Sequence, residues 1–186
     1  MLPIAEREND LHVKSFMNKF NEKIVQQDKE NWFKGVWNDN KNEQNGNKLR
    51  LYRCFKEDIF VENYVTSIMP FHHRQQLSRL RIGCLPIEIE MGRRFNVPLC
   101  ERTCKMCTTN CIEDEIHLLL ECPMYNDLRE KIILCIEDRN LDLKNQYYSL
   151  LSNTNIQADL AKCIFNIMRR RDLFSKMTEQ IFMNVK

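Results

Sequence analysis

Apolar residues recur at three- and four-residue steps over much of the chain, the spacing at which one face of an α-helix is buried. The clearest stretch runs from 11 to 25, and Asp28 can cap a second, short helix that carries Trp32 and Trp37. Further helices are predicted over 49–55, 59–69, 74–84, 128–136, 148–151 and 156–174, and residues 86–98 are predicted to be extended. Because regular strand alternation is scarce, the sequence predicts a mostly α fold with a small irregular centre.

A run of polar residues divides the chain. Residues 38–48 are rich in Asn and contain almost nothing to bury, so they are predicted to form a linker. The linker separates an N-terminal helical segment, residues 1–37, from a central helical domain, residues 49–138, and C-terminal helices are expected over 139–186. The aromatic residues of the N-terminal segment are expected to be core, and the alternative is a stripe that docks another protein.

The composition indicates an ordinary globular protein. The chain has 186 residues, of which 43% are hydrophobic, and this is enough for a real core. The net charge is only +2, so any surface that attracts nucleic acid must be local. The first residues turn polar too early for a signal peptide, and no apolar run approaches the roughly 18 residues that a spanning helix needs. We therefore expect an intracellular protein, nuclear or cytoplasmic, that is not inserted in a membrane.

Nine cysteines without an export signal favour free thiols or metal ligands over disulfides. Cys104 and Cys107 form a Cys-x2-Cys pair, and they are followed along the chain by His117 and Cys122. Such a Cys3His set supplies the four tetrahedral ligands of a closed structural Zn²⁺ site. The alternative set has Cys111 in place of Cys104.

The second half of this cluster is predicted to lie on a helix. The acidic run 113–115 places negative charge in its first turn, where the helix dipole favours it. In an unbroken α-helix, His117 and Cys122 would lie about 140° apart, at roughly 100° per residue. Pro123 biases Cys122 away from helical backbone, so its sulfur can turn back toward His117. The helical domain is therefore predicted to contain a small zinc-stapled knuckle.

Three segments carry a resemblance to a known family. They are Arg79–Arg94 with its Glu-x-Gly-Arg bend, Pro98–Cys107, and Glu113–Pro123 with its Glu-Asp-Glu-x-His…Cys-Pro order. Together they resemble the zinc-binding module near the C-terminus of reverse transcriptases of non-LTR (LINE-type) retrotransposons. The likeness covers about residues 48–129 in order. It implies that the family's zinc ligands fall on Cys104, Cys107, His117 and Cys122.

Motifs for catalysis are missing from the sequence. No two Asp are adjacent, so the Asp pair that holds polymerase metals is absent, and no Pro-Asp begins an endonuclease motif. The glycines are isolated, so there is no loop that cradles phosphates. We therefore expect a non-enzymatic protein, a detached or degenerate C-terminal piece of such a reverse transcriptase. A decayed fragment without a selected role is the alternative.

Basic residues between His72 and Lys105 are the remaining functional candidates. The planar fork of arginine suits bidentate phosphate contacts, and beside a zinc site it favours RNA or DNA as the partner. The candidates for such contacts are Arg74, Arg81, Arg93 and Arg94. One alternative is that these arginines pair with nearby glutamates, and another is a zinc-stabilised protein–protein interaction domain without nucleic-acid binding. The triplet 169–171 is expected to be a solvated helix end.

Overall fold

The computed structural model of the protein describes residues 4–37, 48–56 and 59–184, and its regular structure is helical. The mostly α fold is therefore confirmed. Extended pairing within these residues is limited to an isolated antiparallel bridge between Thr103 and Ile112. In chain order the elements are α1 (Ile4–Val36), η1 (Tyr52–Cys54), α2 (Asn63–Thr66), α3 (Phe71–Arg81), α4 (Glu88–Arg94), η2 (Leu99–Glu101), η3 (His117–Glu121), η4 (Pro123–Tyr125), α5 (Asn126–Ile133), α6 (Leu143–Ser152), η5 (Thr154–Ile156) and α7 (Gln157–Asn184).

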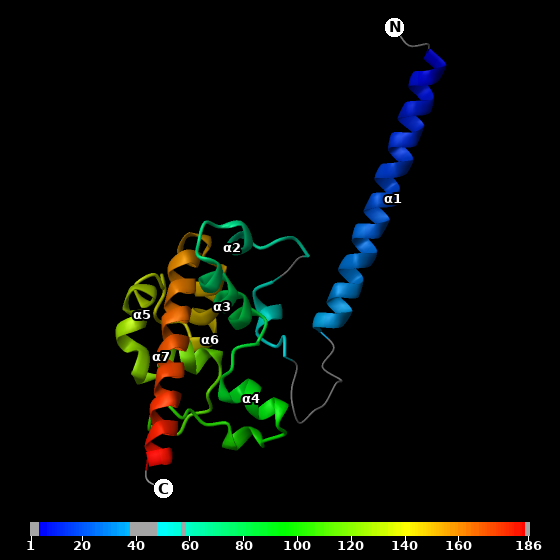
Figure 1. The fold of residues 1–186 in the computed structure, drawn as a ribbon. Helices are drawn as coiled ribbons and strands as arrows, with labels where there is room; N and C mark the ends of the chain where they lie inside the picture. Colours follow the sequence, from blue (N-terminus) through cyan, green and yellow to red (C-terminus); the bar gives the residue numbers. More distant parts are fainter. Residues whose placement is uncertain (1–3, 38–47, 57–58, 185–186) are drawn as a thin grey trace.

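The long helix α7 organises the body of the molecule. Helices α3 and α5 both pack against it, and α6 contacts η3, so the segment that carries His117 lies within the helical body (Figure 1). Apolar residues from all of these elements fill the interior: Leu77, Leu80, Leu118, Leu119, Ile132, Tyr147, Leu150, Leu160, Ile164 and Ile167. Their burial is the main force that holds the helices together.

Helix α1 is a single helix, and the prediction of a helical pair with a break at Asp28 is wrong. No residue between the two predicted helices stops helix propagation. The side chain of Gln26 donates a 3.0 Å hydrogen bond to the side chain of Glu30, one turn later, across the position of the predicted break. The helix stands away from the body in Figure 1. Near its C-terminal end, the Trp32 ring lies 6.4 Å from the Tyr52 ring, and the Arg53 guanidinium lies over Trp37.

Two other predictions of secondary structure are corrected. Residues 88–94 form α4 where an extended segment was predicted, because the buried Glu113 side chain accepts a hydrogen bond from the amide of Glu88 at 2.9 Å and caps the helix. The helix predicted over 59–69 is reduced to the short α2. The predicted linker lies outside the described residues except for Lys48.

None of the helices in the described part of the chain combines the length and the apolar character that crossing a membrane requires.

A close approach between α4 and the following loop yields a stability prediction. A Cβ on Gly92 would lie 2.5 Å from Cγ of Arg102, whose guanidinium is held by the carbonyls of Val97 and Ile89. Gly92→Ala should therefore lower the free energy of unfolding by about 1–3 kcal/mol, measured by chemical denaturation. The control is Gly35→Ala in α1, where a Cβ meets nothing within 4 Å, and it should cause no loss. Equal stability of the two variants would contradict the packing described.

Candidate metal centre

The first half of the centre is a knuckle, residues 104–111, closed by backbone hydrogen bonds. The amide of Cys104 donates to the carbonyl of Cys111 at 2.9 Å, beside the bridge between Thr103 and Ile112. Asn110 adopts a left-handed conformation, with φ of 58°, that turns the chain back. Backbone amides within the Cys-x2-Cys turn donate to the Cys104 sulfur. The turn thereby directs the sulfurs of Cys104 and Cys107 to the same side.

The second half of the centre is a π-helical turn, η3, that the sequence did not predict. The amide of Cys122 donates to the carbonyl of His117 at 2.8 Å, an i→i+5 bond that places residues five apart on similar sides of the helix. Asp114 accepts a hydrogen bond from the His117 amide at 2.8 Å and caps the turn. Cys122 itself has extended backbone, with φ −56° and ψ 117°, just before Pro123. The expected departure of Cys122 from the helix is confirmed. The π turn brings the side chain of Cys122 to the same side of the chain as His117.

The four predicted ligands meet at one point. Sγ of Cys104, Cys107 and Cys122 and one ring nitrogen of His117 all lie within 4.8 Å of one another. The two sulfurs of Cys104 and Cys122 are 4.0 Å apart, and Nε2 of His117 is 3.5 Å from Sγ of Cys107. Zn–S bonds of about 2.3 Å and Zn–N bonds of about 2.0 Å at tetrahedral angles give ligand separations of about 3.8 and 3.5 Å. The cluster therefore has the dimensions of a site that can hold a metal ion.

Burial shapes the chemistry of these thiols. Because Cys104 and Cys122 are buried away from water, the pKa of each thiol is raised above its usual value. At Cys107, burial also opposes ionisation, but hydrogen bonds from Thr109 and His117 outweigh it and lower the pKa to about 6. A divalent cation among these sulfurs would favour the thiolate form of all three.

The imidazole is oriented for coordination from one side. Nε2 of His117 faces Cys107, whereas Nδ1 lies 3.5 Å from a carboxylate oxygen of Glu121. A carboxylate hydrogen-bonded to the second ring nitrogen is the usual outer partner of a histidine that binds metal. Glu121 is the nearest carboxylate to Nδ1, but Nδ1 is buried and makes no hydrogen bond, so Glu121 does not fix the ring in this structure.

Cys111 does not join this cluster. Its side chain is exposed, and its sulfur lies 3.6 Å from the carbonyl oxygen of Thr109. Of the two ligand sets that the sequence left open, the structure brings together the one that contains Cys104.

A buried ion pair links the centre to α7. The side chain of Glu113 is fully buried, lies 3.4 Å from the sulfur of Cys104 and pairs with Arg171. Arg171 was expected to be solvated, but it is 9% exposed. The signal that could have found it is the spacing of the buried residues Leu160, Ile164, Ile167 and Met168 in the sequence, because Arg171 continues their stripe.

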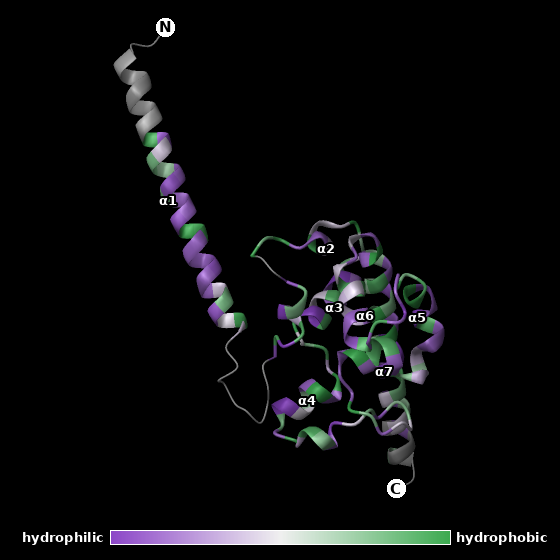
Figure 2. Ribbon diagram, turned by 180° about the vertical axis from the view of Figure 1, so that it is seen from behind, coloured by the Kyte–Doolittle hydropathy of each residue, from purple (hydrophilic) through white to green (hydrophobic). Residues whose placement is uncertain are grey.

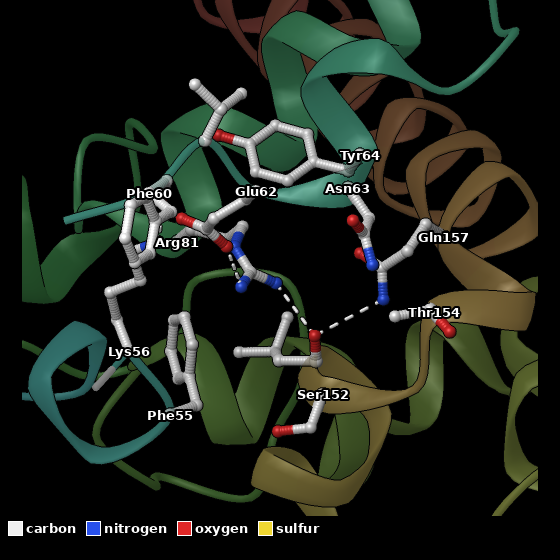
Figure 3. A pocket seen from close by; sticks show the side chains of 12 residues that line it. Phe55, Lys56, Phe60, Glu62, Asn63, Tyr64, Arg81, Ser152, Thr154 and Gln157 are labelled. Atoms are coloured by element: carbon white, nitrogen blue, oxygen red, sulfur yellow. Dashed lines mark hydrogen bonds and ion pairs between the residues drawn. The ribbon is translucent and has the colours of Figure 1, made fainter. Parts of the chain in front are cut away.

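The prediction that Arg81 contacts phosphates is wrong, because this residue is part of the interior. Its guanidinium pairs with Glu62, donates to the carbonyl of Leu151 at 2.8 Å and lies against the rings of Phe55 and Tyr64. Figure 3 shows these groups around a pocket of about 320 Å³. Arg81 is 6% exposed, so its role is to hold α3 to its neighbours.

The other three arginines differ in how far they are engaged. Arg74 donates to the carbonyls of Tyr64 and Ser67, at 3.3 and 2.6 Å, so its fork is used to fasten α2. Arg93 is half-buried and pairs with Glu90 at 2.8 Å. Arg94, at the end of α4, is exposed. The four arginines therefore do not form one free basic face.

Comparison with known proteins adds no family: no family model, no curated protein and no solved structure matches this chain. The geometry of the cluster consequently carries the functional interpretation.

Removing one ligand should weaken metal binding. With three protein ligands left, Cys122→Ser should lower the metal content of the purified protein below that of the wild type, measured by elemental analysis. Cys111→Ser changes an exposed thiol outside the cluster and should keep the full content. If the two variants bound the same amount of metal, the ligand set would be wrong.

Removing the cation that faces Glu113 should destabilise the fold. Arg171→Gln leaves a buried carboxylate without its charged partner, so the free energy of unfolding should fall by about 3–5 kcal/mol. Arg169→Gln removes the same charge from an exposed side chain two residues away and should cost less than about 0.5 kcal/mol. Denaturant titration of both variants is the measurement, and a similar loss in both would count against the buried pair.

Proposed function

We propose that the chain is a non-enzymatic zinc-binding module that contacts RNA or DNA. The observation that carries the proposal is the convergence of three sulfurs and one imidazole nitrogen within 4.8 Å. Cysteine sulfur and histidine nitrogen suit Zn²⁺, and a full set of four protein ligands leaves no open position for a substrate. The ion then acts as a structural cross-link, and the binding function is carried by the surface that the ion holds in place.

Helix α4 is held in place by the residues that flank the knuckle, Arg102 and Glu113. The backbone of Glu113 accepts from the Ile89 amide at 3.0 Å, while its side chain caps the helix. Arg102, on the other side of the knuckle in the sequence, donates to the carbonyl of Ile89 at 3.2 Å. These contacts fix the direction of α4, whose last turn carries Arg93 and Arg94.

The arginines at the end of α4 are the proposed phosphate contacts. Arg94 is exposed, and Arg93 can share its guanidinium between Glu90 and a phosphate because it is only half-buried. Lys105 in the knuckle is 74% exposed, although it pairs with Glu88, and adds a third cation. The resemblance of residues 48–129 to the zinc-binding module of LINE-type reverse transcriptases supports nucleic acid as the partner.

Binding to short fluorescent single-stranded and hairpin RNA and DNA, followed by anisotropy at several salt concentrations, tests this proposal. The double variant Arg93→Gln/Arg94→Gln should weaken binding and reduce the salt slope by about 1–2, because up to two phosphate contacts are lost. The single variant Arg169→Gln removes an exposed charge elsewhere and should leave the slope unchanged.

Metal removal provides the second arm of the experiment. Cys122→Ser should weaken nucleic-acid binding, since α4 loses its support. Unchanged affinity in the double arginine variant, with metal content intact, would refute the proposed contact face. It would leave the metal centre in place.

A further inference from the structure

The apolar face of α1 is not covered by the part of the chain that the structure describes. Val13, Phe16, Met17, Phe20 and Ile24 are between 43% and 67% exposed. They lie on one side of the helix, since their spacing of three and four residues confines them to an arc of about 100°. Figure 2 shows a few green bands between hydrophilic turns of α1, which stands away from the body. A face of this kind on a long helix is stabilised when a second helix covers it.

The order of residues along this face matches a short two-stranded coiled coil. In a heptad frame, Met17, Ile24 and Asn31 occupy successive a positions. The d positions hold Val13, before Met17, and Phe20 and Gln27, between the a positions. Such a seam, running from 13 to 31, would extend along about 27 Å of helix.

Asn31 distinguishes between the ways in which two such helices can pair. A single Asn at an a position favours two parallel strands, because the two amides then hydrogen-bond to each other across the axis. An antiparallel pair in the matching register would instead place Asn31 against Val13 of the second copy and leave its amide unpaired. Identical chains in parallel register are therefore the occupant that this seam fits best.

The charges beside the seam support the same arrangement. Lys23 lies at a g position and Asp28 at the following e position, five residues later. Within one helix these side chains point about 140° apart. In a parallel dimer, g of one helix faces the next e of the other, so Lys23 meets the Asp28 of the second copy, twice by symmetry. In the antiparallel register, Lys14 would face Asp28 of the second copy, but Lys23 would face Lys23, so only the parallel pairing has no like-charge contact at Lys23.

We propose that two copies of this chain associate through α1 as a parallel coiled coil over residues 13–31. This interface goes beyond the proposed nucleic-acid binding, and it uses none of the residues of the metal centre or of α4.

Sedimentation equilibrium of the full chain over a range of concentrations tests the interface. A thiol reductant must be present because Cys54, Cys100 and Cys111 are exposed. The wild-type chain should show a reversible monomer–dimer equilibrium.

Ile24→Glu should raise the dimer dissociation constant at least about tenfold, because it places charge in the seam. Val25→Glu changes the neighbouring residue, equally exposed but outside the seam, and should leave the constant within about twofold. A monomeric wild-type chain at all concentrations, or equal effects of the two variants, would overturn the proposal.

Charge exchange tests the parallel direction. Lys23→Glu and Asp28→Lys should each weaken the dimer, and the double variant should recover most of the wild-type affinity, because the pair is re-formed with reversed sign. In an antiparallel dimer, the double variant would show no recovery. That result would overturn the parallel pairing, while metal content and RNA binding would be unaffected by it.

Discussion

The convergence of three sulfurs and one imidazole in a buried space is the constraint on which the centre of this protein depends. Without a cation, burial keeps the thiols of Cys104 and Cys122 protonated and leaves them with weak hydrogen bonds. A bound divalent ion would replace these with coordinate bonds, which contribute about 10–16 kcal/mol in zinc-finger peptides. Since a whole domain is stable by only about 5–15 kcal/mol, metal and fold would be closely coupled here.

Glu113 connects this centre to the rest of the molecule. Its carboxylate contacts the Cys104 sulfur, caps α4 through the amide of Glu88 and pairs with Arg171 of α7. A buried carboxylate beside thiolates is unfavourable unless cations compensate for it, and Arg171 supplies one such charge within the protein. The knuckle is therefore anchored in the helical body by a charge network as well as by apolar packing. It differs in this respect from a zinc finger that folds by itself.

The sequence predicted those features that depend on short spacings. The cysteine and histidine spacing predicted the cluster, and apolar periodicity predicted α3, α5 and α7. Features set by distant partners were missed. Helix α4 depends on a cap from Glu113, 25 residues away. A charged side chain usually indicates exposure, but Arg81 and Arg171 lie in the interior, where Glu62 and Glu113 neutralise them. The π turn in η3 has no simple sequence signal, although it completes the ligand set.

The two proposed surfaces would reinforce each other. One chain has a net charge of only +2, and its free cations near the centre are few, so a single copy would attract nucleic acid weakly. Association through α1 would place two copies of the proposed phosphate-binding end of α4 in one assembly. Once one copy has bound a nucleic acid, the other copy would bind the same strand at a high effective concentration. A coiled coil outside the metal centre would thus raise the affinity for nucleic acid without any change in the residues that contact it.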